Sequence, residues 1–323
     1  MLRNLLYSQF IAAFFPQYAA PAKLEAFDNQ SADDLSKFDG YYSDLRISIL
    51  ISSLQNKGES GLTISDTFIG PRELYQVDEN LFVDKLTNQF TAFKLDEDGK
   101  VLYMKEPYIN PMGYASKGVD PAGFADVTES HEYAEYIYAL QSLGIYSNNS
   151  TERFYPEKAV TRAEYIQHIL EVSNIRATDT AEPAFTDLEG HPAAGYIQTA
   201  YELGMVNGNG SGLFEPDRII TRQEAAVMLW RIYKQQYPDQ LFTDVKVAGD
   251  TSAWAVQAVQ MMTSLGIHGP EVTVEADGSV DFASKEVLTK QEEATIIYML
   301  FTQPTDIIVR ELSAKSEASA DAA

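Results

Sequence analysis

The chain has 323 residues, of which 45% are hydrophobic, and a formal net charge of −23 at pH 7. This length accommodates two or three compact units. So acidic a chain is unsuited to nucleic acid or to an anionic membrane surface, where Lys and Arg make the contacts. Cysteine is absent, which excludes disulfide frameworks and cysteine-based metal sites. The four histidines lie far apart without zinc-ligand spacing, so we expect neither a metal nor any other cofactor.

Residues 1–34 begin with a mostly apolar run at positions 5–15, followed by the small residues of Ala20-Pro21-Ala22. A positive charge, an apolar run and small residues outline a weak signal peptide. We place an amphipathic helix that ends before Pro16 ahead of this interpretation. The run is too short to cross a bilayer and no other segment qualifies, so we expect no membrane span.

Residues 35–117 change to an alternation of apolar and polar residues that is typical of strands. Positions 90–95 and 101–104 flank a turn that contains Asp98-Gly99, which is the pattern of a β-hairpin. We therefore predict a small antiparallel β domain here. The Gly- and Pro-containing residues 115–121 are predicted to be a linker.

From residue 118 the sequence repeats itself three times. A Phe-x-Asp motif opens the copies at Phe124, Phe185 and Phe242, so the openings are 61 residues (124 to 185) and 57 residues (185 to 242) apart. Each copy predicts a helix that ends at Leu-Gly, a polar turn and a second helix. We place the modules at 118–178, 179–238 and 239–305, with about ten extra residues of the third copy between 269 and 281 on loop-length grounds. The Ala- and Ser-rich tail, 306–323, is predicted to be disordered.

The second helix of each copy opens with an apolar residue, Thr, a cation, a small or amide residue, and Glu. Thr followed three residues later by Glu is the capping box of a helix N-terminus. The predicted structural caps are Thr161 with Glu164, Thr221 with Glu224, and Thr289 with Glu292. A cation at the first helical position is disfavoured by about 0.3–1 kcal/mol. Because this misfit occurs at three equivalent places, we expect a bound anion there.

These motifs resemble the S-layer homology family, whose pattern runs Phe-x-Asp-Val, His-Trp-Ala, Gly-Ile-Ile-x-Gly, Phe-x-Pro and Ile-Thr-Arg-Ala-Glu. The resemblance covers residues 124 to about 303 and implies a pseudo-threefold helical domain that holds a secreted protein on a Gram-positive-type cell wall. It further implies an extracellular location and a partner that is a secondary cell-wall polysaccharide on peptidoglycan, often bearing ketal-linked pyruvate. By position, the family's glycan-contacting Arg corresponds to Arg162 and Arg222. Lys290 is a weaker replacement because it lacks the planar fork of Arg.

The family's Trp position is occupied by Glu132, Pro192 and Trp254 in the three copies. Trp254 is either a sugar-stacking platform, serving Arg222 or Arg162 across an interface, or a core aromatic. The turn at 207–210 either offers backbone amides to a ligand or is only a turn. The candidate glycan-binding residues are thus Arg162, Arg222, Lys290, Trp254, Gly208 and Asn209.

We therefore predict an α+β chain with a small antiparallel β unit followed by an all-α trimodular domain, acting as a non-catalytic cell-wall anchor. The β region also resembles the C-terminal β appendage of serine hydrolases of the β-lactamase and penicillin-binding type, in motifs such as Phe38-Asp39-Gly40-Tyr41-Tyr42. The first alternative is therefore the C-terminal fragment of such an enzyme, without its catalytic domain, because Ser-x-x-Lys and Lys-Thr-Gly are absent. The second alternative is a set of repeats that only self-assembles or packs against another protein.

Overall fold

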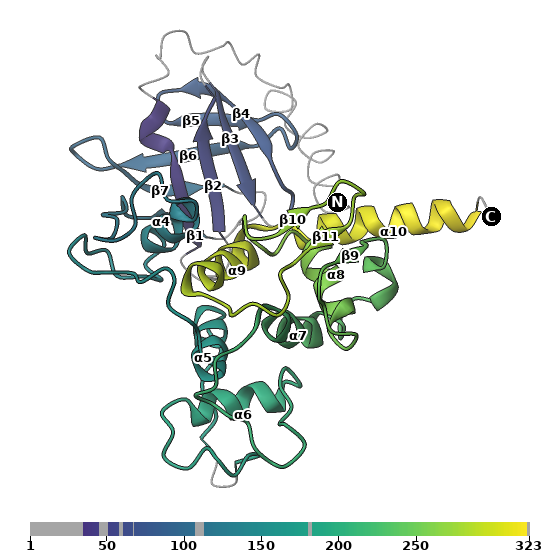
Figure 1. Cartoon of the computed structure of the whole chain (residues 1–323). Helices are drawn as coiled ribbons and strands as arrows, with labels where there is room; N and C mark the ends of the chain where they lie inside the picture. The colour runs from purple at the N-terminus through teal and green to yellow at the C-terminus, as the bar shows by residue number, and fades with distance from the viewer. Residues whose placement is uncertain are drawn as a thin grey trace.

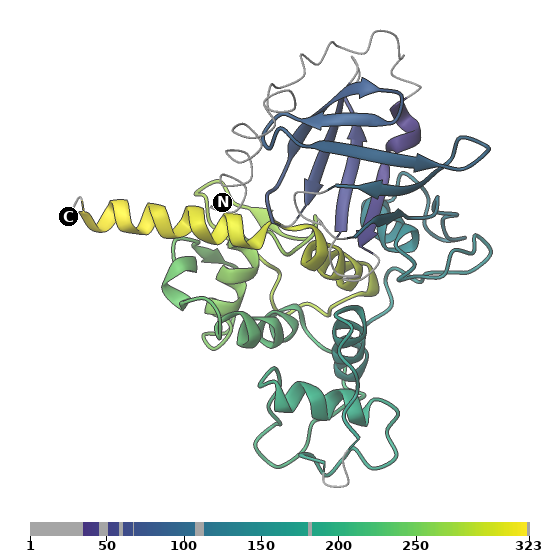
Figure 2. The ribbon, with the colours of Figure 1, turned by 180° about the vertical axis from the view of Figure 1, so that it is seen from behind.

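The computed structural model describes residues 35–44, 51–57, 61–66, 68–106, 113–179 and 183–321. The predicted signal peptide or N-terminal helix, residues 1–34, lies outside this range. The described chain has a strand-rich N-terminal part and a helical C-terminal part (Figure 1). Figure 2 shows the same two parts from behind, with helix α10 extending to one side.

The N-terminal part is a closed barrel of eight antiparallel strands in sequence order. The prediction of a small β unit followed by a linker is wrong, because the strands close into a barrel and the predicted linker supplies the last of them. Ala115–Lys117, part of the predicted linker, is strand β8, and it pairs with both β1 and β7 to close the barrel. The hairpin predicted around Asp98-Gly99 is confirmed as β6 and β7. The strands are β1 (Gly40–Asp44), β2 (Ile51–Asn56), β3 (Gly61–Asp66), β4 (Arg72–Asp78), β5 (Leu81–Asp84), β6 (Phe90–Leu95), β7 (Val101–Lys105) and β8 (Ala115–Lys117).

The barrel interior is filled by side chains. Phe38, from the short 3₁₀ helix η1 (Ser36–Phe38), packs against Phe82 and Phe93 with ring centroids 5.2 and 4.5 Å away. A second, polar group surrounds Arg72, whose guanidinium pairs with Asp66, Asp84 and Glu106. All four side chains are almost fully buried. Since a buried charge without a partner is costly, these residues depend on one another.

The C-terminal part contains three repeats of two helices each, which we call repeats 1, 2 and 3. As predicted, a glycine with positive φ follows the first helix of each repeat: Gly144, Gly204 and Gly266, at 74°, 74° and 66°. The turn before each second helix also holds a residue with left-handed backbone, Tyr155, Glu215 or Ala283, at equivalent positions. The helices are α4 (Ala134–Ser142) and α5 (Arg162–Val172), α6 (Ala194–Glu202) and α7 (Arg222–Tyr233), and α8 (Val256–Ser264) and α9 (Lys290–Thr302).

The C-terminal part is not all-α, and this correction concerns repeat 3. Its extra residues form a hairpin of β10 (Thr273–Val274) and β11 (Val280–Asp281), which pairs with β9 (Val247–Ala248), close to the 3₁₀ helix η2 (Asp239–Phe242). The α+β class as a whole is consistent with the structure. The tail predicted to be disordered forms α10 (Thr305–Asp321) instead. Its apolar residues Ile308, Val309 and Leu312 pack on the helical core, which supplies the burial that composition alone did not indicate.

The three repeats form a closed ring through backbone hydrogen bonds. The amide of Val160 donates to Leu288 (3.0 Å), that of Leu288 donates to Ile220 (2.9 Å), and that of Ile220 donates to Val160 (3.0 Å). These residues immediately precede the three capping threonines. Repeat 3 therefore contacts repeat 1 in the same way as repeat 1 contacts repeat 2.

The barrel packs on repeats 1 and 3. Tyr41 of β1 meets Tyr298 of α9 with hydroxyl oxygens 3.2 Å apart, and the Tyr298 ring also contacts Tyr136 of α4. Ile51 of β2 belongs to the hydrophobic core of the helical part. The barrel and the ring of repeats thus share a packed interface.

Candidate functional site

Each of the three candidate cations lies at the first position of a second helix, directly after a capping threonine. The capping box forms at all three N-termini. The carboxylates of Glu164, Glu224 and Glu292 accept from the amides of Thr161, Thr221 and Thr289 at 2.9, 2.9 and 3.0 Å. The central helices α5, α7 and α9 therefore begin where the sequence predicts.

Each cation also faces the next repeat around the ring, so the site has residues from two repeats. The backbone amides of Arg162, Arg222 and Lys290 donate to the carbonyls of Arg218, Glu286 and Lys158 at 2.9, 3.0 and 2.9 Å. These three acceptors occupy the same place, three residues before a capping threonine. We call the three contact regions junction 1–2, junction 2–3 and junction 3–1, after the repeats that they join.

Junction 1–2 contains Arg162, which is only 8% exposed. Its Nε donates to the carbonyl of Phe214 at 2.9 Å, and its guanidinium lies over the Phe214 ring at 4.5 Å. Among the residues that the structure describes, no carboxylate forms an ion pair with Arg162. Burial lowers the pKa of the Arg162 guanidinium and nearby Arg218 lowers it further, while Glu224 and Glu215 act in the opposite direction. In the described part of the chain, Arg162 is thus a buried cation without a carboxylate in direct contact.

Junction 3–1 has the same arrangement with a lysine. The Lys290 ammonium lies 4.4 Å from the Phe154 ring centroid and 5.9 Å from that of Tyr146. Burial lowers the pKa of Lys290, against the opposing effect of Glu293. Within the described ranges, Lys290 has no ion pair and the buried Tyr146 hydroxyl has no hydrogen-bond partner.

Junction 2–3 differs, because its cation is already paired. Arg222 contacts both carboxylate oxygens of Glu292, with Nε donating to Oε2 at 3.1 Å. The loop that carries Trp254 is fixed to the same helix N-terminus, since the Ser252 amide donates to Gln223 at 3.0 Å. Trp254 is 57% exposed, so it is not a core aromatic. The loop of Trp254 therefore lies beside the helix N-terminus that carries Arg222.

Gly208 and Asn209 serve the turn in which they lie. A Cβ at Gly208 would come within 2.7 Å of both the Leu213 carbonyl and the Phe185 ring. The Asn209 side chain accepts from Ser211 and donates to Glu215 at 3.1 Å. Packing and turn hydrogen bonds account for both residues.

Sequence analysis missed two contributors to the junctions. The first is the ring of Phe214 or Phe154, which supports the cation of the preceding repeat. The second is the residue three positions before each capping threonine, where Arg218 pairs with Glu224 and Lys158 pairs with Glu164. Aligning the three copies at the threonine would have shown both positions, but not that they face a neighbouring repeat.

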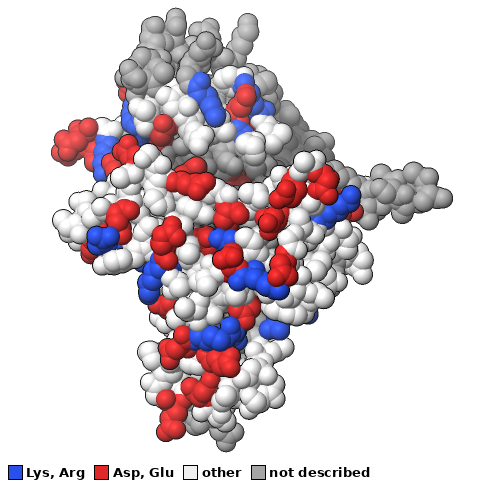
Figure 3. Space-filling view, in the orientation of Figure 1, with Lys and Arg blue, Asp and Glu red and all other residues white. Residues whose placement is uncertain are grey.

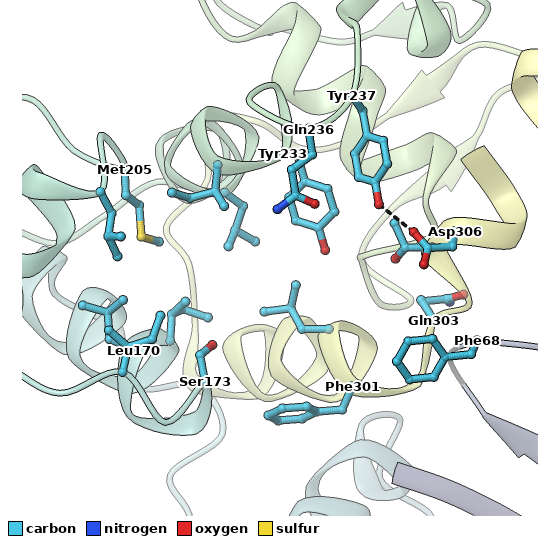
Figure 4. A pocket seen from close by; sticks show the side chains of 17 residues that line it. Phe68, Leu170, Ser173, Met205, Tyr233, Gln236, Tyr237, Phe301, Gln303 and Asp306 are labelled. Carbon is cyan, nitrogen blue, oxygen red and sulfur yellow. Dashed lines mark hydrogen bonds between the residues drawn. The ribbon is translucent and has the colours of Figure 1, made fainter. Parts of the chain in front are cut away.

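The opposite end of the central helices holds an apolar cavity of about 540 Å³. Figure 4 shows side chains from α5, α7 and α9 around it, with Phe68 of the barrel at one side. Its polar rim includes Tyr237, whose hydroxyl donates to Asp306 at 2.8 Å. The cavity has none of the candidate cations in its lining, so it is separate from the junctions.

The cations of the junctions act locally within an acidic surface. Figure 3 shows acidic side chains spread over one face, with basic side chains scattered among them. Within the described ranges, no group of three or more His, Asp and Glu side chains is placed to hold a metal ion. Among the helices that the structure describes, none combines the length and apolar character needed to cross a membrane.

One ion pair between repeats is expected to make their contact sensitive to pH. His168 of α5 lies 3.0 Å from both carboxylate oxygens of Glu293 in α9. Burial alone would lower the pKa of His168, but the hydrogen bonds and charge of Glu293, aided by Glu164 and Glu171, raise it above the ordinary 6.5. A raised pKa means that the pair stabilises the fold fully below pH 6.5 and ceases to do so as pH rises through the folded-state pKa.

We therefore expect the Tm of the chain to exceed that of His168→Gln at pH 5.5 and the difference to shrink by pH 8.5. Thermal unfolding across this pH range measures it. His131→Gln is the matched control, because His131 has no carboxylate partner among the described residues. A Tm difference that stays constant with pH would contradict the expectation.

Comparison with known proteins agrees with the ring of repeats. The family model of the S-layer homology domain matches residues 123–166 and 184–226. Exoglucanase XynX from Acetivibrio thermocellus is 29% identical over 205 residues, which are 61% of this chain and 18% of that protein. An S-layer protein from Bacillus thuringiensis subsp. finitimus is 28% identical over 194 residues, 58% of this chain and 22% of that protein. Cell surface glycoprotein 1 from Acetivibrio thermocellus is 26% identical over 155 residues, 44% of this chain and 6% of that protein.

Repeats 1 and 2 thus match the S-layer homology domain, and the chain belongs at the cell surface, in the cell wall. Modules of this class serve cell-wall anchoring. The chain spans less than a quarter of the length of each of these relatives. The alternative of a serine hydrolase fragment gains no support from them.

Proposed function

We propose that residues 118–305 form three S-layer homology modules, at 118–178, 179–238 and 239–305, that anchor the chain non-covalently to the cell wall. The proposed ligand is an anionic secondary cell-wall polysaccharide, and the group recognised is a carboxylate such as that of ketal-linked pyruvate. The observation that carries this proposal is Arg162, a buried guanidinium without a carboxylate partner among the described residues.

A charge removed from water is costly unless an opposite charge and hydrogen bonds compensate for it. At Arg162 the Phe214 carbonyl and ring supply part of this compensation. A ligand carboxylate would supply the rest through a bidentate contact, to which the planar guanidinium is suited. The first amides of α5 already donate to Arg218, Pro216 and Thr161, so only the helix dipole would add a further attraction for the anion.

Arg222 gives an internal example of a carboxylate bound at this position. Its guanidinium takes both oxygens of a carboxylate at the position equivalent to Arg162. The site geometry is therefore compatible with a two-oxygen acid. Lys290 offers a second, weaker site, because an ammonium binds as a point charge.

We further propose that Trp254 stacks on a sugar ring at junction 2–3. Its large exposed face is what a carbohydrate platform requires, and aromatic side chains pair an apolar face with a polar edge. Gly208 and Asn209 are proposed to act only by shaping the turn beside Glu215, since their contacts lie within it.

The test is a pull-down of the full chain with purified peptidoglycan sacculi, before and after hydrofluoric acid removes the attached polysaccharide. We expect binding to intact sacculi and loss of binding after the treatment. Equal binding to both preparations would assign the contact to peptidoglycan itself. Binding to neither preparation would contradict the anchoring role and favour repeats that only pack against protein.

A further inference from the structure

We infer that Glu292 fills the cation site of junction 2–3 as an internal carboxylate and that Glu286 is the reason. The acid group of an external glycan then binds only at junctions 1–2 and 3–1, and Trp254 at junction 2–3 meets a sugar ring without that group. This inference rests on the proposed function, and it concerns which of the three sites is open.

The argument starts from the partner of each capping glutamate. In repeat 1, Glu164 pairs with Lys158 at 2.7 Å, and in repeat 2, Glu224 pairs with Arg218 at 2.6 Å. Both partners lie three residues before the capping threonine of the same repeat. A cation of the same repeat therefore neutralises the cap, and the cation from the preceding repeat has no carboxylate partner within the described residues.

In repeat 3 the equivalent position is Glu286, which cannot neutralise Glu292. Glu292 is 3% exposed on its side chain, so its charge needs a partner inside the junction. The available cation is Arg222, whose own amide donates to the Glu286 carbonyl. The Arg222–Glu292 pair follows from this one difference in sequence.

The charge around Arg222 reinforces the pairing. Glu271, from the extra residues of repeat 3, also interacts electrostatically with Arg222, and its carboxylate accepts from the Tyr133 hydroxyl at 3.1 Å. Arg222 thus interacts electrostatically with two glutamates, Glu292 and Glu271, whereas Arg162 has the basic Arg218 beside it. An incoming carboxylate would have to displace Glu292 from Arg222 and leave its buried charge without a cation.

The first experiment measures site number in the full chain by calorimetry with a methyl glycoside that bears a ketal-linked pyruvate. We expect Glu286→Lys to gain one binding site relative to the unsubstituted chain, because Lys at position 286 would pair with Glu292 and release Arg222. Glu292→Gln is expected to give the same gain, since the amide can still accept from Thr289. Glu97→Lys, which makes the same charge change on an exposed barrel turn, is expected to gain none.

The second experiment needs no ligand. Arg222→Ala is expected to lower the Tm of the unsubstituted chain by several degrees and to lower it far less in the Glu286→Lys background, where Glu292 has another partner. Equal losses of Tm in the two backgrounds, or an unchanged number of sites in Glu286→Lys while the unsubstituted chain binds, would overturn the inference. If the unsubstituted chain binds no glycoside but the two Tm losses differ, the internal pairing stands and the proposed ligand is wrong.

Discussion

Arg162→Ala is expected to weaken binding of the chain to pyruvylated wall polysaccharide by about 10- to 100-fold, since a hydrogen bond to a charged group contributes roughly 1.5–3 kcal/mol. Arg162 is the strongest candidate because it is buried, forms a fork-shaped donor and has no carboxylate partner in the described part of the chain. Arg162→Lys keeps the charge but loses the planar fork of Arg. Its affinity is therefore expected to lie between that of the unsubstituted chain and that of Arg162→Ala. Binding isotherms with released polysaccharide measure the three affinities.

The matched control is Arg176→Ala, which removes an exposed arginine of the same repeat. We expect it to leave affinity within about twofold, as surface charges contribute little. Arg162→Ala should also keep most of its thermal stability, because no buried carboxylate loses its partner. Unchanged affinity in Arg162→Ala, with the fold intact, would remove Arg162 from the binding site.

Arg72→Leu is expected to destabilise the barrel by about 3–5 kcal/mol, the range for breaking a buried ion pair. The substitution would leave Asp66, Asp84 and Glu106 facing one another inside the barrel without a cation. Urea unfolding followed by far-UV circular dichroism measures the loss. Tryptophan fluorescence follows the repeats separately, because both tryptophans, Trp230 and Trp254, lie in them.

Lys85→Leu is the comparison for Arg72→Leu. Lys85 pairs with Glu73 on the outside of the barrel, with both side chains partly exposed, so its removal is expected to cost at most about 1 kcal/mol. Similar losses for the two variants would mean that the Arg72 group contributes no more than a surface pair.

The helical repeats could be predicted closely because their signals are local. Thr161 and Glu164 are three residues apart, and Gly144 lies two residues after the end of its helix, so neighbouring residues decide both features. Barrel closure was missed because it joins β1 to β8 across more than 70 residues of sequence. Only pairing at that distance distinguishes a closed barrel from a small sheet, and alternation within one strand does not report it.

In the candidate site, too, local features could be predicted from the sequence and contacts between distant residues could not. The repeated cation was visible in sequence, but its surroundings come from another repeat. Arg162 meets Phe214, which lies 52 residues further along the chain, and Arg222 meets Glu292, which lies 70 residues further along. Sequence reasoning therefore found the cations and could not decide which of them was free.

The ring of backbone hydrogen bonds through Val160, Ile220 and Leu288 determines how the number of junctions can change during evolution. Every junction belongs to two repeats, so deleting one repeat from the gene would abolish two junctions together. Loss of repeat 3 would leave junction 1–2 alone, with Arg162. A point change such as the one at Glu286, by contrast, alters a single junction and leaves the ring intact. Evolution of this anchor can therefore adjust the number of open sites one at a time only by substitution, and never by shortening.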